Sequence, residues 1–248
     1  MIGLFDSGSG GLTVLAALRA RAPHADIAYF GDIKNAPYGE RSAEELSRLT
    51  EHGLMRLSDM GATEIVSACN SVSLSVLTSA AGHANVIEMT RPTARALRAH
   101  AGARMLLIAT PATIRSGIYR DAIGVSVLFD ELPIPELASA IEFGGTKEKI
   151  RSIIKSSFLK QDGKKYDGVI LGCTHYPFVR EEIAEAAREM FGATLIIDPA
   201  EAVAEEAVRR FNVEGSGLMR LLISKDSSLF RLRVRELFPK SSYTIDTV

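Results

Sequence analysis

The sequence predicts an α/β protein made of two doubly wound domains. Two observations carry this prediction. Short apolar runs alternate with helical stretches along most of the 248 residues, and two cysteines close apolar runs at equivalent places in the two halves of the chain. Such alternation is typical of parallel sheets with helices on both faces. In such sheets, ligands bind at the carboxyl ends of the strands.

Strands are expected where short apolar runs occur. In chain order these runs are Ile2–Phe5, Ile27–Phe30, Glu64–Ser67, Met105–Ala109, Val125–Phe129, Val169–Leu171 and Leu195–Ile197. Helices are expected where apolar residues recur at helical spacing, at Leu12–Leu18, Leu46–Leu57, Val179–Met190, Pro199–Phe211 and Ser227–Leu237. The second helix follows Ser42 and Glu45, which form a capping-box pattern. We expect the last two helices to pack back on the first domain.

The two halves resemble copies of one unit. In each, the first strand ends in a turn-prone, hydroxyl-rich loop, DSGSGG from Asp6 and TPAT from Thr110, and a cysteine follows at the same spacing, Cys69 or Cys173. This pattern predicts two flavodoxin-like lobes related by a pseudo-twofold, with the active site in the cleft between them. We expect one domain to comprise residues 1–92 plus 208–248, and the other residues 93–207.

Composition argues against several classes of protein. The chain is 46% hydrophobic with a formal net charge of -1, so nothing points to nucleic acid. The densest basic cluster, Arg231, Arg233 and Arg235, alternates with apolar residues, which indicates a solvated helix or strand face. The sequence shows neither a signal-peptide pattern nor a long apolar run. We therefore expect a cytoplasmic protein with no nucleic-acid or membrane partner.

The two cysteines also have less specific interpretations. A lone cysteine is often a small buried hydrophobic residue, and a structural disulfide is not expected in a cytoplasmic chain. A zinc site would need more ligands at short spacing, and no CxxC or HExxH motif occurs. Cys173 with His175 suggests a cysteine hydrolase, but residues two apart need not face each other, and Cys69 would then have no role. A base-and-acid pair of thiols uses both cysteines.

The glycine-rich loop after the first strand has its own alternatives. Gly8, Gly10 and Gly11 do not have the spacing of a dinucleotide or P-loop motif. The loop instead offers backbone N–H groups at a helix N-terminus, which suit a carboxylate. Asp6, at the start of the loop, is as readily explained as a turn or cap residue.

Several longer blocks together carry a family resemblance. They are FDSGSGGLTVL, YFGDIKNAPYGERS, ACNS, ATPATIRSGIY and LGCTHYP, in that order. With them the chain resembles the cofactor-independent glutamate racemases of the aspartate/glutamate racemase superfamily. The resemblance implies an isomerase that interconverts L- and D-glutamate by proton transfer between two thiols, without a cofactor or metal, and supplies D-glutamate for peptidoglycan. We also expect a homodimer.

The resemblance assigns roles position by position. The catalytic residues it implies are Cys69, Cys173, Asp6, His175 and Glu142. The substrate-binding residues are Asp6, Ser7, Tyr38, Gly39, Asn70, Ser71, Thr174 and His175. Asp6 would assist the first thiol, which faces D-glutamate, and His175 the second, which faces L-glutamate.

The chain departs from the family pattern at two places. Ser71 stands where the family usually has threonine, and the segment EMTRPTARALR, from Glu88 to Arg98, lacks the usual apolar, proline-containing approach to the domain junction. Two alternatives therefore stay open. One is a racemase or isomerase of another small acid such as aspartate. The other is a catalytically silent relative that binds an acidic ligand or a protein partner.

Overall fold

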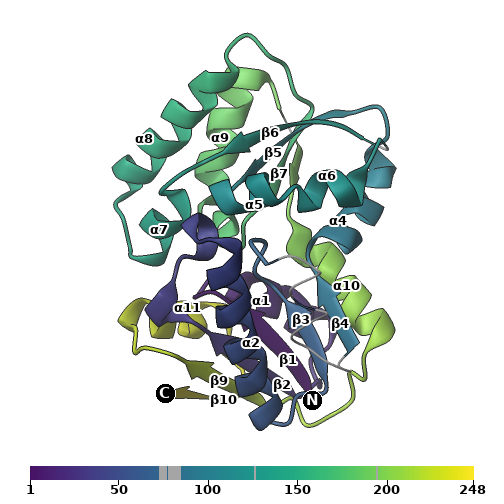
Figure 1. The fold of residues 1–248 in the computed structure, drawn as a ribbon, viewed down its shortest axis with the longest axis vertical. Coiled ribbons are helices and arrows are strands. Elements are labelled where there is room, and N and C mark those ends of the chain that lie inside the picture. Colours follow the sequence, from purple (N-terminus) through teal and green to yellow (C-terminus); the bar gives the residue numbers. More distant parts are fainter. Residues whose placement is uncertain (73–76, 78–84, 126, 194) are drawn as a thin grey trace.

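The protein folds into two α/β lobes, each built on a parallel sheet (Figure 1). The computed structural model describes residues 1–72, 77, 85–125, 127–193 and 195–248. Helices cover both faces of each sheet. Most of the strands are continuous apolar runs, so neither face of the sheet could be left exposed to water. The predicted fold class, with two doubly wound α/β lobes, is confirmed.

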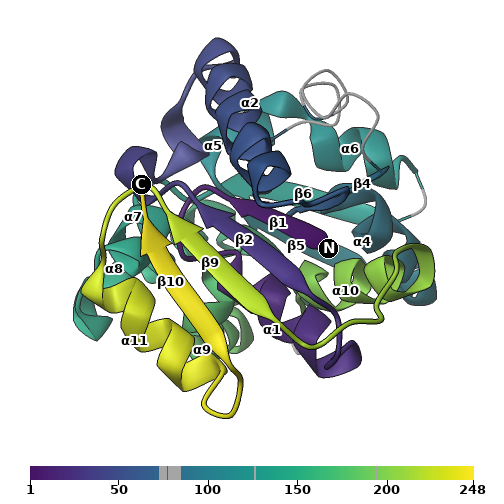
Figure 2. The same cartoon turned by 90° about the horizontal axis from the view of Figure 1, so that it is seen from below.

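The first sheet has the strand order β10-β9-β2-β1-β3-β4. Its strands are β1 (Ile2–Asp6), β2 (Ile27–Gly31), β3 (Glu64–Ser67), β4 (Asn85–Glu88), β9 (Met219–Ile223) and β10 (Tyr243–Thr247). One face packs against α1 (Leu12–Arg21), α10 (Pro199–Arg210) and α11 (Ser228–Leu237), and the other against α2 (Ala43–Asp59). Figure 2 shows these strands side by side, with α2 on one side of the sheet and α1 and α10 on the other.

The second sheet has the strand order β6-β5-β7-β8. Its strands are β5 (Arg104–Ala109), β6 (Leu128–Pro133), β7 (Gly168–Gly172) and β8 (Leu195–Ile197). One face packs against α7 (Leu137–Glu142), α8 (Lys147–Phe158) and α9 (Arg180–Phe191), and the other against α4 (Thr90–Leu97) and α6 (Ile118–Ile123). Counted within each lobe, both sheets contain the order 2-1-3-4, which agrees with the repeat seen in the sequence.

Short elements connect these layers. Helix α5 (Pro111–Ser116) directly follows β5, and single-turn 3₁₀ helices occur at Ile33–Asn35, Tyr38–Glu40, Arg98–His100, Leu159–Gln161 and Tyr176–Val179. The predicted capping box of α2 is present: the Glu45 N–H donates to Ser42 Oγ at 3.2 Å, and the Ser42 N–H donates to Glu45 Oε2 at 3.1 Å. None of the helices in the described ranges is long and apolar enough to cross a membrane.

Most expected strands are observed within a residue or two of their predicted bounds, but one is displaced. The strand expected at 125–129 is observed as β6, Leu128–Pro133, and residue 126 lies outside the described residues. Strands β4, β9 and β10 were not predicted. The late helices α10 and α11 do pack in the core of the first lobe, through Ala204, Phe230 and their neighbours. The division into residues 1–92 plus 208–248 and 93–207 stays a prediction.

The topology brings four strand ends together. Strands β1 and β3 are neighbours in the first sheet, as β5 and β7 are in the second, and each pair lies where the strand order reverses. Asp6 ends β1 and Cys69 follows β3, whereas Thr110 follows β5 and Cys173 follows β7. A hydrogen bond from Thr174 Oγ1 to Asp6 Oδ1, 3.1 Å long, joins the two lobes at this edge.

Candidate active site

The glycine-rich loop after β1 lets the two lobes approach closely. A Cβ atom on Gly10 would lie 2.4 Å from Thr174 Oγ1 and 2.7 Å from His175 Nδ1, and one on Gly8 would lie 3.0 Å from the Glu142 carboxyl group. Any side chain at these positions would push the two loops apart. The glycines therefore serve contact between the lobes.

Cys173, His175 and Glu142 form a buried chain. Cys173 Sγ lies 3.7 Å from His175 Nδ1, and His175 Nε2 lies 2.6 Å from Glu142 Oε2. Residues two apart need not face each other, but the Cys173 and His175 side chains do. The polypeptide backbone turns tightly here, and the Tyr176 N–H donates to the Cys173 carbonyl at 3.1 Å. Glu142, a catalytic residue implied by the family resemblance, contacts His175 through Nε2, the ring nitrogen that does not face Cys173.

The negative charge of Glu142 and the positive charge of protonated His175 stabilise each other. Burial lowers the pKa of His175, but hydrogen bonds to Cys173 and Glu142 and their negative charges outweigh it and raise that pKa to about 10. Burial raises the pKa of Glu142, but its bonds to His175 and Ser9 prevail and hold the pKa below the ordinary value. Glu142 is therefore a carboxylate, and His175 is readily protonated beside the Cys173 thiol.

Cys69 has different surroundings. Burial raises the pKa of its thiol, and the nearby Asp6 carboxyl raises it further, to about 12. Hydrogen bonds from the Ser71 backbone and the Ser7 side chain offset only part of this effect. Burial also raises the pKa of Asp6, against the opposing charge of His175. Cys69 therefore stays protonated at neutral pH, with a carboxyl group nearby that can exchange a proton.

Asn70 presents a buried donor that is free to bind a ligand. Its Oδ1 accepts a hydrogen bond of 2.5 Å from Tyr119 Oη, which fixes the orientation of the amide. Its Nδ2 is buried and has no hydrogen-bond partner among the residues the structure describes. Because an unpaired buried N–H is costly, this atom is suited to a ligand oxygen.

Ser71 joins a cluster of hydroxyl groups across the lobes. Its Oγ lies 3.1 Å from Thr110 Oγ1 and 3.3 Å from Thr113 Oγ1. Gly39 packs closely against Thr110. A Cβ atom on Gly39 would lie 2.7 Å from Thr110 Cβ. The Tyr38 side chain is directed elsewhere, since its hydroxyl donates to Asp32 Oδ2 at 2.7 Å. Toward a ligand, the Tyr38 hydroxyl is therefore left only as an acceptor.

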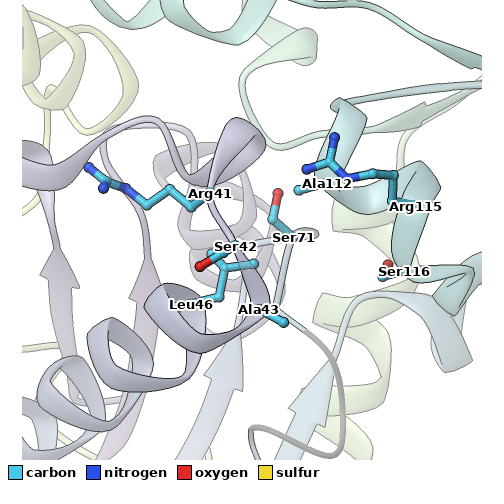
Figure 3. A pocket seen from close by; sticks show the side chains of 8 residues that line it. All are labelled: Arg41, Ser42, Ala43, Leu46, Ser71, Ala112, Arg115 and Ser116. Atoms are coloured by element: carbon cyan, nitrogen blue, oxygen red, sulfur yellow. The ribbon is translucent and has the colours of Figure 1, made fainter.

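A pocket of about 240 Å³ opens beside this hydroxyl cluster. One wall comes from the start of α2 and the residues before it, and the other from α5, with Ser71 between them (Figure 3). The lining residues are Arg41, Ser42, Ala43, Leu46, Ser71, Ala112, Arg115 and Ser116. Residues of both lobes therefore form the approach to Ser71.

Sequence reasoning missed several residues around the site. Ser9 and Tyr119 lie inside the sequence blocks FDSGSGGLTVL and ATPATIRSGIY that carry the family resemblance. Their place in these blocks could have marked them as candidate site residues. Arg233 had no such signal, and its interpretation as part of a solvated face is wrong. It is buried, and its Nη2 donates to the Ile141 carbonyl at 2.6 Å. Arg235, on the same helix, is exposed as expected.

Comparison with known proteins agrees with this geometry. The model of the Asp/Glu/hydantoin racemase family matches residues 13–207. The glutamate racemase of Aquifex aeolicus is 34% identical to the chain, over 91% of this chain and 89% of its own length. The chain belongs to the Asp/Glu/hydantoin racemase family.

Solved structures of Asp/Glu/hydantoin racemase family members share the whole fold. The glutamate racemase isoform of Bacillus anthracis superposes with a TM-score of 0.87 at 27% identity, covering 100% of this chain and 97% of its own. The glutamate racemase of Francisella tularensis, solved in complex with D-glutamate, has a TM-score of 0.83 at 25% identity, covering 100% and 96%. The family resemblance found in the sequence is thereby confirmed.

The unequal surroundings of the two thiols predict unequal reactivity. Iodoacetamide reacts with thiolates, and Cys173 has a protonatable histidine beside it, whereas Cys69 has a carboxyl group. At pH 7 to 8, peptide mapping by mass spectrometry should therefore find Cys173 alkylated before Cys69. Glutamate should slow the reaction. Faster modification of Cys69 would contradict this assignment of charges.

Proposed function

We propose that the protein interconverts L- and D-glutamate and so supplies D-glutamate for peptidoglycan. One observation carries the proposal. Two buried, unbridged thiols follow equivalent strands of two facing lobes, each with its own proton-accepting neighbour, and a hydrogen bond from Thr174 to Asp6 joins the two lobes at this edge. Close relatives named glutamate racemase support the choice of substrate.

Racemisation requires a proton to leave one face of the α-carbon and another to arrive at the opposite face. The family resemblance implies that Cys173 is the base toward L-glutamate, and the His175 ring beside it is placed to stabilise a negative sulfur. Cys69, held protonated, then delivers a proton from the other side, and Asp6 restores it. The reverse reaction exchanges these roles. Since thiols and their neighbours supply both proton transfers, the reaction needs no cofactor.

The proposal places the substrate between the two strand-end loops. The free Asn70 Nδ2 is suited to the α-carboxylate, whose charge grows as the proton leaves. We include Ser7, Ser71 and Thr174 among the substrate contacts because their buried hydroxyls lie at the same edge. Gly39 and backbone atoms of Tyr38 complete the proposed site.

A side-by-side assay of L-glutamate, L-aspartate and L-glutamine tests this function. One methylene moves the side-chain carboxylate beyond hydrogen-bond reach and leaves a buried donor unpaired, which costs about 1 to 3 kcal/mol. Glutamate should therefore be preferred over aspartate by roughly fivefold to 160-fold in kcat/KM. Equal or better turnover of aspartate would refute the substrate assignment. No turnover of any of the three would favour a silent relative that only binds an acidic ligand.

We also propose that the protein acts as a cytoplasmic homodimer. Sedimentation of the purified chain, with and without glutamate, tests the oligomeric state. A monomer at every concentration would contradict it.

A further inference from the structure

The tail helix α11 inserts one buried arginine between the lobes, close to the Cys173 chain. We propose that Arg233 is a positioning residue: through Ser9 and Glu142 it holds His175 with Nδ1 directed at the Cys173 thiol. This inference rests on the proposed two-thiol function, but its test does not require turnover. No substrate contact is assigned to Arg233.

The geometry around Arg233 is closed on all sides. Its guanidinium lies over the Phe178 ring, 4.2 Å from the ring centre, and only 8% of the residue is exposed. Nη1 donates to Ser9 Oγ and lies 3.7 Å from Glu142 Oε2, while Nη2 donates to the Ile141 carbonyl. The planar guanidinium thus bonds the β1 loop and the end of α7 through two separate nitrogens, whereas an ammonium group has only one nitrogen from which to reach both.

The hydrogen-bond directions in this network follow from chemistry. A guanidinium can only donate, so Ser9 Oγ must accept from Arg233. The one hydrogen of the Ser9 hydroxyl is then directed to Glu142 Oε2, which lies 2.5 Å away and also accepts the Ser9 N–H at 3.1 Å. Two donors and a nearby cation keep Glu142 ionised and accepting.

The same logic determines the state of His175. Because the Glu142 carboxylate accepts, the proton between it and His175 belongs to Nε2. Nδ1 is then the atom that meets Cys173 Sγ, either accepting from the thiol or, when protonated, donating to the thiolate. Without Arg233, the Ser9 hydroxyl is free to turn away from Glu142, and Glu142 loses the guanidinium charge that lies 3.7 Å from its Oε2.

Alkylation of Cys173 tests this role directly. In a Cys69→Ser background, Arg233→Met should slow the reaction of Cys173 with iodoacetamide at pH 7 by roughly tenfold, because Ser9 and Glu142 then no longer hold His175 Nδ1 against the thiol and the thiolate loses its stabilising neighbour. Arg235→Met, on the exposed side of the same helix, is the matched control and should leave the rate unchanged. In a Cys173→Ser background, Arg233→Met should leave Cys69 alkylation unchanged.

Two further variants keep the test decisive. Arg233→Lys retains the charge but not both hydrogen bonds, so its Cys173 alkylation rate should lie between those of wild type and Arg233→Met. If Arg233→Met does not fold, judged by far-UV circular dichroism, Arg233→Lys is read against wild type, and an equal rate overturns the proposal. An unchanged rate in folded Arg233→Met overturns it also, even if racemisation falls. Failure to racemise glutamate would refute the proposed function, whereas the alkylation rates still decide on Arg233.

Discussion

Cys69→Ala and Cys173→Ala should each reduce racemisation of glutamate by roughly 10⁴-fold, to the limit of detection, because each removes one of two proton-transfer groups. Both thiols are buried and neither is bridged, so alanine removes a single sulfur from a packed site. The double variant should be no worse than either single one, since either change already breaks the unit. Circular dichroism of glutamate follows the reaction in both directions.

The two variants should differ in residual exchange of the α-proton with deuterated water. Cys69→Ala retains the Cys173 chain and should exchange L-glutamate faster than D-glutamate, and Cys173→Ala should show the opposite preference. Nuclear magnetic resonance of each enantiomer measures these rates. Wild-type racemisation by either variant would remove the basis of the mechanism.

Glu142→Gln should have the next largest effect, a fall in kcat of roughly a hundredfold with KM little changed. The amide keeps the shape of the carboxylate but cannot balance a charge on His175, whose Nε2 lies 2.6 Å from Glu142 Oε2. Steady-state kinetics in both directions, with far-UV circular dichroism as a check of folding, provides the measurement. Because the two enantiomers interconvert with an equilibrium constant of one, kcat/KM must fall equally in both directions, and an unchanged kcat in a folded variant would contradict a catalytic role for Glu142.

The same variant should change how stability depends on pH. The pKa of His175 is raised in the folded protein from 6.5 to about 10, so its charge contributes stability that is complete below about pH 6.5 and is lost as the pH rises through about 10. Glu142→Gln removes one source of this shift. Urea unfolding between pH 6 and 10 should therefore show a shallower decline in the free energy of unfolding than wild type shows. If the free energy of unfolding of Glu142→Gln and of wild type declined in parallel with pH, Glu142 would not be a source of the raised pKa of His175.

Local patterns in the sequence were sufficient to predict the strand ends that carry the thiols. Apolar runs directly precede Cys69 and Cys173, and their placement needs no knowledge of distant residues. Strand β10 lacked such a signal, because Tyr243–Thr247 is an edge strand with alternating half-buried and exposed positions and few apolar residues. An edge strand pairs with a single neighbour, here β9, and can therefore be part of the sheet although few of its side chains are buried.

Contacts between distant segments could not be predicted in the same way. Arg233 has the same local pattern as Arg231 and Arg235, and only the docking of α11 decides that it is buried beside Ser9. The Tyr38 hydroxyl likewise bonds Asp32, a partner that motif matching does not reveal. Only the family resemblance singled out Glu142, whose Oε2 lies 2.6 Å from His175 Nε2, because no periodicity in the sequence links the two residues.

The most direct test of the two-thiol mechanism is the wash-in of deuterium during the first turnovers of wild-type protein. L-glutamate is supplied in deuterated water, and both enantiomers are analysed by mass spectrometry before a tenth of the substrate has reacted. If one thiol removes the proton and the other delivers a solvent-derived deuteron, the D-glutamate formed should carry deuterium while the remaining L-glutamate does not. D-glutamate that retains the original proton, or L-glutamate that exchanges as fast as product forms, would contradict two separate bases.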